Sequence, residues 1–558
     1  MNFSNLEDEY DVIVAGGGIT GAGVYYEAVK RGYKTLLLEA KDFAWGTSSR
    51  SSKMVHGGLR YLKQGKFLLT RQAVKQRELL LKQYPGLVTP LKYIMPLFDH
   101  YGPSMFAMKA GLSIYSLMAG ETQHEIYTKN QAIQTINEIG RVRQENLVAA
   151  VGFKDAQVDD ARLVLRLIDK GNLLGGMALN YIKVVGVERD KKGCVAAVNI
   201  RDEESGLTCE IKTKVLINAT GVFAEELHAS PEKGFHIRPL RGSHLIFPHI
   251  SSHIDPQGKF ALDQVLSFIH PKDLRPVFLF PWEGSTVLGT TDVDHYQDIK
   301  TEPFVTMEEA DYLMEGLKYV LPDINLSLND CTSTIAGVRP ILSKKNRAAS
   351  KESREHVVWK DRGLITITGG KLTTFQLLAK DALKAAKPYL PNATTLITDQ
   401  KAKHHHRDII WSNNVSGELQ ERLIGRYGKD GCQKISQYDA TLFTPIEKTK
   451  TVWAEILYAA EHENICHLSD LLLRRVRVGL FLHKGGINIL DKVEALCKPH
   501  LNRYKTSGND KSQHSLNWNN LNRNITKWDD QRWEMEKKDY LKLWKTFYSP
   551  YFNRKQEV

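Results

Sequence analysis

Three glycines near the N-terminus have the spacing of a loop that holds the phosphates of a dinucleotide. They lie in residues 11–39, DVIVAGGGITGAGVYYEAVKRGYKTLLLE, which read as an apolar strand, a glycine turn, a helix and a second strand. Gly16 allows a tight turn out of the strand, Gly18 lets the backbone approach a pyrophosphate, and Gly21 lets the helix pack closely on the sheet. This order of elements predicts a dinucleotide-binding unit.

The helix expected from about Ile19 and the acid Glu39 complete this unit. Such a helix directs its positive end at the phosphates. Glu39 ends the second strand, where a carboxylate accepts hydrogen bonds from a ribose diol, and this favours an adenosine ribose without a 2′-phosphate. The fingerprint alone does not separate NAD from FAD.

Two later segments favour FAD. Residues 215–221, VLINATG, look like a buried strand that ends in a turn of small residues, as in a segment that returns beside the first phosphate loop. Residues 364–382, LITITGGKLTTFQLLAKDA, read as a strand, a Gly369-Gly370 turn and a helix. We expect the N-terminus of that helix to face the flavin pyrimidine, where it would stabilise the negative charge that reduction brings.

The expected fold class is α/β: an FAD-binding Rossmann-like domain of the glutathione-reductase and D-amino-acid-oxidase type, an inserted antiparallel-sheet substrate domain, and a C-terminal α-helical domain. A chain of 558 residues can hold two or three domains. Short β-branched and aromatic runs broken by Gly and Pro in residues 236–292 predict the antiparallel sheet. The FAD-binding domain is expected in three segments, 1–90, 151–235 and 336–390. The substrate or cap domain is expected at 91–150 and, as the antiparallel sheet, at 236–335, and the helical domain at 391–558.

The formal charge of +12 favours polyanionic partners such as an anionic membrane surface, a phosphorylated substrate or a nucleic acid. A solvated basic surface without a specific partner is an equal alternative. No nucleic-acid motif accompanies the basic residues, so we expect no nucleic-acid partner. Six cysteines without a C-x-x-C pair predict reduced thiols in a cytosolic compartment. The consecutive histidines 404–406 cannot share one face and lack an acidic partner, so we expect no metal.

Two helical patterns bear on membrane contact. Residues 105–119 are apolar but too short to span a bilayer, and they carry Lys109, so we expect a core or interface-lying helix. Residues 533–552 mix aromatic residues with lysines, which suits either a membrane interface or, more often, core packing. The N-terminal leader shows neither a signal-peptide nor a transit-peptide pattern.

The chain resembles the family of aerobic, FAD-dependent glycerol-3-phosphate dehydrogenases over most of its length. The most specific motif is SSKMVHGGLRYL, within residues 46–62. The other motifs are GGGITGAG, DDARL, INATG, RGSH, GTTD, AGVRP, SREH, TGGKLTT and DLLLRRVRVGLFL. The absence of a transit pattern and of a calcium-loop pattern makes the bacterial form the better match.

The resemblance implies a site for an anionic substrate. Oxidation of the C2 alcohol of glycerol 3-phosphate needs a hydride acceptor, a group that takes the hydroxyl proton, and cations that hold the phosphate. The implied substrate residues are Arg60, Tyr61, Arg339, Arg354 and Lys371. For the base we favour His244 of RGSH, because imidazole titrates near neutral pH, with Arg339 polarising the alkoxide.

The cofactor residues implied in the same way are Gly16, Gly18, Gly21, Glu39, Thr47, Ser48, Ser49, Lys53, Gly57, Gly221, Gly370 and Thr373. We expect Thr47, Ser48, Ser49 and Lys53 around the pyrophosphate and flavin, and Gly370 with Thr373 at the pyrimidine edge. His56 would be the candidate for a covalent flavin link, but the resemblance does not support one, so noncovalent FAD is expected.

The expected activity is oxidation of glycerol 3-phosphate to dihydroxyacetone phosphate, with electrons passed to a membrane quinone. The expected location is the cytoplasmic face of the inner membrane, with a homodimer as one possible assembly. An oxidase that passes electrons to oxygen and makes hydrogen peroxide is the alternative, although no inserted segment typical of such oxidases is evident. An FAD-containing RNA-binding protein would leave SSKMVHGGLRYL without a role.

Overall fold

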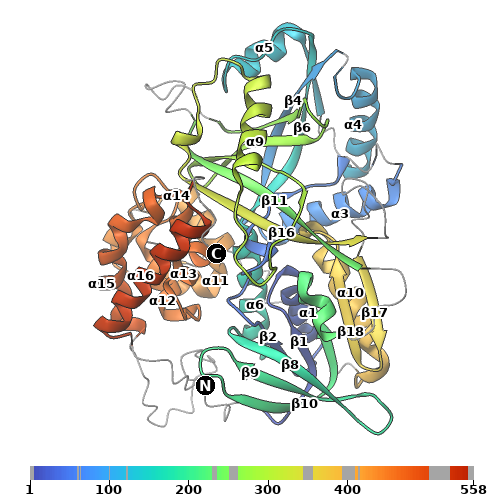
Figure 1. Ribbon diagram of the computed structural model, residues 1–558, viewed down its shortest axis with the longest axis vertical. Helices are drawn as coiled ribbons and strands as arrows, with labels where there is room; N and C mark the ends of the chain where they lie inside the picture. Colours follow the sequence, from blue (N-terminus) through green and yellow to red (C-terminus); the bar gives the residue numbers. More distant parts are fainter. Residues whose placement is uncertain are drawn as a thin grey trace.

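The computed structural model arranges the chain as two β-sheets and a helical domain beside them (Figure 1). The described residues are 6–59, 62, 65–99, 101–120, 124–228, 236–250, 262–343, 356–392, 409–411, 415–501 and 528–550.

The first sheet has eight strands and a parallel centre. Its order is β17-β18-β10-β1-β2-β7, and β9 pairs with both β10 and β8. The strands are β1 (Glu9–Ala15), β2 (Thr35–Leu38), β7 (Met177–Leu179), β8 (Ile182–Arg189), β9 (Val195–Asp202), β10 (Thr208–Asn218), β17 (His356–Asp361) and β18 (Leu364–Gly369). The parallel pairs are β1 with β2 and β10, β10 with β18, and β2 with β7. Each parallel connection therefore needs a crossover.

Three helices form the layer on one face of this sheet: α1 (Ile19–Lys30), which connects β1 to β2, α6 (Asp160–Leu173), which leads into β7, and α10 (Phe375–Ala386), which follows β18. Their buried residues form one hydrophobic core with Val12, Val14, Val215 and Ile365 of the sheet. On the opposite face, β8 and β9 cover Ile13 and Leu36. Asp159 caps α6 by accepting the Arg162 N–H at 3.2 Å.

The second sheet has ten strands and is antiparallel except where β12 meets β4. Its strands are β3 (Met54–Val55), β4 (Val88–Phe98), β5 (His124–Thr128), β6 (Leu147–Val158), β11 (His236–Pro248), β12 (Val265–Ile269), β13 (Pro276–Trp282), β14 (Ser285–Gly289), β15 (Val293–Asp294) and β16 (Ser333–Ser343). The expected domain boundaries at 150 and 335 fall inside β6 and β16, since both strands continue this sheet.

Helices α5 (Lys129–Asn137) and α9 (Met307–Val320) pack on the second sheet in one core. Helices α3 (Phe67–Gln83) and α4 (Met105–Ala119) lie in contact with each other at its side (Figure 1). The short helix α7 (Ala224–Leu227) follows β10. No described helix is both long enough and apolar enough to cross a membrane.

The helical domain holds α11 (Gly417–Ile435), α12 (Trp453–His462), α13 (Leu468–Asp470), a π-helical turn (Leu471–Arg475), α14 (Val478–Phe481), α15 (Leu490–Leu501) and α16 (Asp530–Phe547). In α16, Trp533, Tyr540 and Trp544 are buried, so the aromatic residues of this helix serve core packing. Trp544 Nε1 donates to the Gly479 carbonyl at 2.8 Å. The alternative of membrane insertion by these three side chains is thereby excluded.

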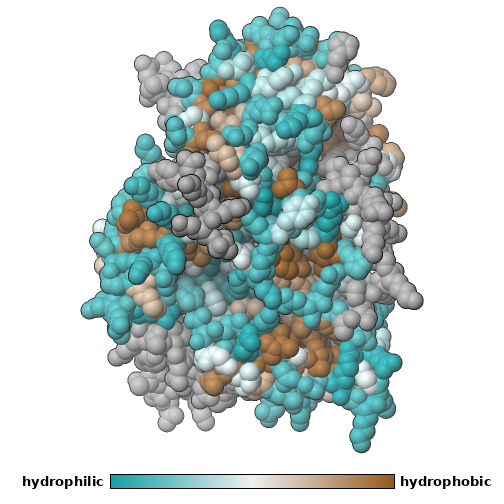
Figure 2. Space-filling model, in the orientation of Figure 1, coloured by the Kyte–Doolittle hydropathy of each residue, from teal (hydrophilic) through white to brown (hydrophobic). Residues whose placement is uncertain are grey.

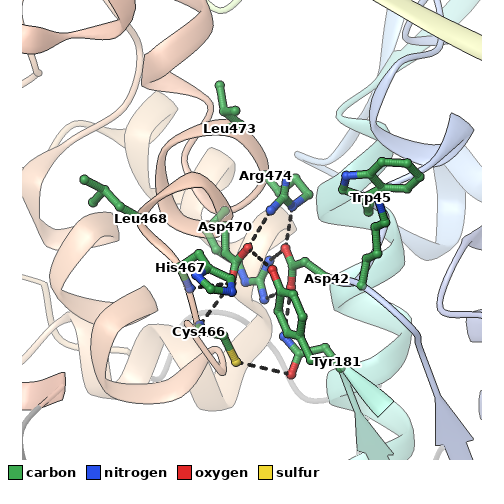
Figure 3. A network of polar contacts seen from close by, with 12 residues as sticks. Asp42, Trp45, Tyr181, Cys466, His467, Leu468, Asp470, Leu473 and Arg474 are labelled. Carbon is green, nitrogen blue, oxygen red and sulfur yellow. Dashed lines mark hydrogen bonds and ion pairs between the residues drawn. The ribbon is translucent and has the colours of Figure 1, made fainter. Parts of the chain in front are cut away.

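Buried charges join the helical domain to the first sheet, in what we call the domain joint: Asp42, Asp470, Arg474 and Arg475. Figure 3 shows the first three of these residues. Asp42 accepts from Arg474 Nε at 2.5 Å and from both terminal nitrogens of Arg475 at 2.6 and 2.8 Å. Arg474 also donates to Asp470 at 2.5 Å. These guanidinium groups hold the pKa of Asp42 below its usual range although burial opposes this. The RRVRV motif thus fastens two domains together.

Candidate active site

A cavity of about 1250 Å³ lies between the two sheets. The first sheet lines it with Ala15, Gly16, Leu38, Ala219 and Gly369, and the second with Tyr93, Phe153, Phe278 and Arg339. Those residues of the first sheet stand at the carboxyl ends of its parallel strands. Open α/β sheets bind nucleotides in the crevice at that edge, so the cavity has the position of a cofactor site.

The glycine loop is shaped so that backbone forms one wall of the cavity. Gly16 has φ +107°, and a Cβ there would lie 2.6 Å from the Ala219 carbonyl oxygen. A Cβ on Gly21 would lie 1.8 Å from the Gly16 carbonyl oxygen. Only glycine satisfies both contacts, because each neighbour is backbone. This is the cradle that a pyrophosphate needs.

Glu39 and Ser48 complete the nucleotide end. The Glu39 carboxylate lines the cavity and accepts the Gly17 N–H at 2.6 Å and the Lys41 N–H at 2.9 Å. Burial raises the pKa of Glu39 although these N–H groups oppose it. Ser48 Oγ accepts the Ile19 N–H at 2.9 Å, at the first residue of α1. The residues at this end fit the adenosine diphosphate half of FAD.

The Gly-Gly turn predicted after residue 364 also reaches the cavity. Gly369 and Gly370 line it with φ of +80° and +73°, followed by Lys371 and Thr373. A one-turn 3-10 helix, Leu372–Thr374, separates this turn from α10. Gly221 lines the cavity with φ +64°. The three glycine turns that the sequence predicted therefore meet around one cavity.

Two guanidinium groups in the cavity lining share one carboxylate. Arg339 Nη1 donates to Asp292 Oδ1 at 3.0 Å, and Arg275 donates to the second oxygen of the same carboxylate. Asp292 is fully buried, whereas the side chains of Arg339 and Arg275 are 22% and 19% exposed and both line the cavity. Both guanidinium groups therefore place positive charge at the cavity wall, which favours an anionic ligand there.

His244 of β11 lies behind the cavity wall. Its side chain is 1% exposed, and Nε2 is 2.9 Å from Ser52 Oγ, while Ser52 itself lines the cavity. Nδ1 has no hydrogen-bond partner among the described residues. Burial, with added repulsion from Lys53 and Arg339, holds the pKa of His244 well below its usual value. The imidazole is therefore neutral at neutral pH.

Gly21, which packs α1 against Gly16, and three further residues implied for the cofactor are absent from the described cavity lining. Among the described residues, the cavity lining includes Thr47 and Ser48 but not Ser49, Lys53 or Gly57. Lys53 Nζ is buried and donates to both Asp160 oxygens at 3.0 and 2.8 Å and to the Ser49 carbonyl at 2.8 Å. The Gly57 N–H donates to Tyr115 Oη at 2.9 Å. These residues hold the wall together from behind, because their polar groups are taken by protein partners.

Other expected residues lie outside the described residues of the chain: Arg60, Tyr61, Arg354 and the histidines at 404–406. Among the residues that the structure describes, no group of three or more His, Cys, Asp or Glu side chains could hold a metal ion. His56, considered for a covalent link, lines the cavity.

Sequence reasoning missed Ser52, Arg275 and Asp292 as site residues. Ser52 lies in SSKMVHGGLRYL and Asp292 ends GTTD, so both were within motifs that carried the resemblance. Arg275 lies in no quoted motif, and it reaches the site only because β13 pairs with β14, which leads to Asp292.

Comparison with known protein families identifies the class to which the chain belongs. Residues 11–376 match the model described as FAD dependent oxidoreductase, and residues 371–507 match the C-terminal domain of alpha-glycerophosphate oxidase. The chain belongs to the FAD-dependent oxidoreductases, and its cofactor is FAD.

Individual relatives narrow this class. The chain is 33% identical over 499 residues to the aerobic glycerol-3-phosphate dehydrogenase of Staphylococcus haemolyticus, covering 84% of this chain and 87% of that protein. It is 31% identical over 520 residues to the enzyme of the same name from Staphylococcus aureus strain MRSA252, covering 87% and 90%. Within its class, the chain is a member of the aerobic glycerol-3-phosphate dehydrogenase family.

Solved structures share the fold. The glycerol-3-phosphate dehydrogenase from Bacillus halodurans, solved in complex with FAD, superposes with a TM-score of 0.70 at 24% identity and covers all of this chain and 98% of that one. The L-alpha-glycerophosphate oxidase from Mycoplasma pneumoniae gives 0.53 at 18% identity, covering 70% of this chain and 98% of that one. The expected fold class, with its FAD-binding α/β domain and C-terminal helical domain, is thus confirmed.

Proposed function

We propose that this enzyme oxidises sn-glycerol 3-phosphate at C2 to dihydroxyacetone phosphate and passes the electrons to a membrane quinone. The observation that carries the proposal is the pair Arg339 and Arg275, which share Asp292 and both line the cavity. The pair offers an anion site beside an uncharged histidine. The names of the relatives supply the particular phosphate ester.

The described residues divide into those that hold the cofactor and those that act on the substrate. When bound, FAD supplies the acceptor for the hydride at flavin N5. Around it we place Gly16, Gly18, Gly21, Glu39, Thr47, Ser48, Gly221, Gly370 and Thr373. Arg339, Arg275 and Lys371 would bind the phosphate, since an Arg fork matches two phosphate oxygens and Lys adds a compact charge. Arg60, Tyr61 and Arg354 remain proposed substrate residues from the resemblance.

His244 would receive the proton that leaves the C2 hydroxyl. Because its pKa is lowered, the imidazole stays in the accepting form when the pH falls below the usual histidine value of 6.5. Arg339 would stabilise the alkoxide as that proton leaves. Arg339 is close enough to His244 for its charge to contribute to lowering the pKa of the imidazole.

An apolar surface beside the cavity supports a quinone acceptor in a membrane. Helices α3 and α4 expose Phe67, Leu68, Met105, Phe106, Ile114 and Leu117, which we call the α3–α4 face. Figure 2 shows hydrophobic residues along the upper right edge, where Figure 1 places α4. Lys66 and Met108 of the same region line the cavity. A lipophilic acceptor could therefore approach the cavity from this face.

The charges on this face suit an anionic membrane surface. Helix α4 carries one charged residue, Lys109, and α3 exposes Arg71 and Lys75. Apolar residues flanked by cations bind anionic lipid interfaces. We place the protein peripherally on the cytoplasmic face of the inner membrane. Phe106→Glu should reduce sedimentation with phosphatidylglycerol vesicles several-fold, whereas Tyr296→Glu, at a 91% exposed position outside the face, should not. Equal sedimentation of both variants would contradict this placement.

Oxygen is the second candidate acceptor, because the model matched by residues 371–507 is described from an alpha-glycerophosphate oxidase. The test is to mix the FAD-loaded protein anaerobically with glycerol 3-phosphate and to follow the flavin absorbance. Glycerol, which lacks the phosphate, is the matched control. Bleaching by the phosphate ester alone supports the substrate, and rapid recovery with a quinone analogue supports the dehydrogenase. Rapid recovery with oxygen and stoichiometric peroxide would favour the oxidase, and no bleaching would refute the substrate.

A further inference from the structure

Ser52 separates His244 from the cavity, which raises the question of how a proton would reach the histidine. The His244 side chain is 1% exposed and is absent from the described cavity lining. On the β14 side, a Cβ on Gly289 would lie 2.2 Å from His244 Cδ2, so the ring packs directly on that strand. The hydrogen-bond contact recorded for the ring among the described residues is Ser52 Oγ, 2.9 Å from Nε2. Ser52 is therefore the polar group between imidazole and cavity.

Ser52 is held in place by the residues on both sides of it. The Ser51 N–H and hydroxyl both donate to Asp160, at 2.9 and 2.7 Å. Lys53 forms its ion pair with the same carboxylate, and its N–H donates to Ser51 Oγ at 3.1 Å. Asp160 is fully buried and is also paired with Arg477 of the helical domain. The backbone at Ser52 is thus fixed by one buried carboxylate.

The backbone geometry indicates that this arrangement is specified and not incidental. Lys53 has φ +59°, a left-handed conformation that costs free energy for a residue other than glycine. The ion pair with Asp160 keeps Lys53 in this conformation, and the chain then turns so that Ser52 faces the cavity while Lys53 faces away from it. The SSK and DDARL motifs then have a common purpose, because together they position one hydroxyl.

We propose that Ser52 relays the proton of the substrate hydroxyl to His244. This proposal rests on the proposed function. The O–H bond at C2 breaks as its proton passes to Ser52 Oγ, and the hydroxyl proton of Ser52 passes to His244 Nε2. The C2–H bond breaks with its electron pair, which leaves as hydride to the flavin, so C2 is oxidised and becomes a carbonyl carbon. The serine ends the step as a neutral hydroxyl and the histidine as imidazolium.

The environment of the ring sets what the relay requires. Burial lowers the pKa of His244 most, and the charges of Lys53 and Arg339 lower it further, so the ring is a neutral acceptor in the free enzyme. The relay uses the tautomer that carries its proton on Nδ1, because only that tautomer directs the Nε2 lone pair to Ser52 Oγ. The two cations disfavour the imidazolium that the relay forms, and the phosphate of a bound substrate would offset them. A hydroxyl held by a fixed backbone needs little reorganisation before the transfer.

The test compares rates of anaerobic flavin reduction in FAD-loaded variants. Ser52→Ala should lower the limiting rate about 100-fold, within the usual range for a lost proton-transfer group. The dissociation constant for dihydroxyacetone phosphate, read from the flavin spectrum, should change less than about threefold. Ser52→Thr keeps a hydroxyl and should retain more than a tenth of the wild-type rate. Ser267→Ala removes another cavity-lining hydroxyl, on β12, and should have no effect.

A double substitution separates a relay from a positioning role. If protons pass through both groups, Ser52→Ala with His244→Ala should be no slower than the slower single variant. If the double variant is slowed by the product of the factors by which the two single substitutions slow flavin reduction, the relay is overturned. A Ser52→Ala rate within threefold of wild type would also overturn it. If Ser52→Ala does not retain FAD, the limiting rate of flavin reduction in Ser52→Thr tests the relay instead. A Ser52→Thr rate as low as that of His244→Ala would overturn the relay. If glycerol 3-phosphate does not bleach the wild-type flavin, the proposed function fails, and the relay with it.

Discussion

The domain joint and the substrate end of the cavity are both built from two arginines on one aspartate, yet they have different surroundings. In the joint, Asp42, Arg474 and Arg475 are buried. Asp470 provides a second carboxylate, which pairs with Arg474 (Figure 3). At the cavity, Arg339 and Arg275 share Asp292 but remain about one fifth exposed. The charges of the joint are enclosed by protein, whereas the two arginines of the second arrangement line the cavity, where a ligand can meet them. Both groups contain the same residue types, so exposure of the arginines to the cavity decides whether they hold domains together or bind a ligand.

The largest effect that would sharpen this contrast is expected at Arg339. Arg339→Ala should lower kcat/KM for glycerol 3-phosphate about 10³-fold, because a cation that meets developing negative charge is lost. Asp292 keeps Arg275, so the free energy of unfolding should fall less than for a change in the joint. Steady-state kinetics and denaturant unfolding measure the two quantities. Arg238→Ala is the control, as Arg238 pairs with Asp294 on the same sheet and does not line the cavity; an equal loss of activity in both variants would contradict the assignment.

The opposite pattern is expected in the domain joint. Asp42→Ala leaves Arg474 and Arg475 without their shared carboxylate, and breaking a buried pair costs about 3–5 kcal/mol of unfolding free energy. The folded fraction should still reduce its flavin at a rate close to that of wild type. Asp361→Ala, which breaks an exposed pair with Arg189, should cost about 1 kcal/mol or less. Equal destabilisation by the two substitutions would show that burial of the joint does not matter.

Substitution of His467, next to the joint, is expected to change the unfolding free energy by a smaller amount that depends on pH. Burial disfavours its charged form, but hydrogen bonds to Glu204 and Glu536 outweigh burial and raise the pKa of His467 to about 10. A raised pKa gives stability that is fully present below pH 6.5 and is lost as the pH rises through about 10. The difference in unfolding free energy between wild type and His467→Gln should therefore shrink over that interval.

His244 provides the contrast at the cavity. Its pKa is lowered, so the unfolded chain takes up this proton before the folded protein does, and its contribution to stability is lost as the pH falls below 6.5. Denaturant unfolding of wild type and His244→Gln across this range should show the opposite sign to His467. The same sign for both histidines would break the comparison between the two regions.

The elements whose patterns are local were predictable. The glycine fingerprint, the antiparallel strands after residue 236 and the helical character of the C-terminal domain follow from local sequence patterns. The meeting of three glycine turns at one cavity was also predictable, since the carboxyl ends of parallel strands share one edge of a sheet. These features depend on neighbours in sequence or on one topological rule.

The direction in which single polar side chains point was not predictable. Lys53 and Ser52 are adjacent in an irregular segment, and only the contact of Lys53 with Asp160, 107 residues away, decides which of them faces the cavity. Asp42 accepts a hydrogen bond from Arg474, which lies 432 residues later in the sequence. The sequence by itself determined the class of cofactor, the sheet and the helices, because backbone turns and apolar spacing are local properties. The tertiary structure alone decided which charges recognise a ligand and which hold the domains together, because pairing and burial arise only when distant segments pack.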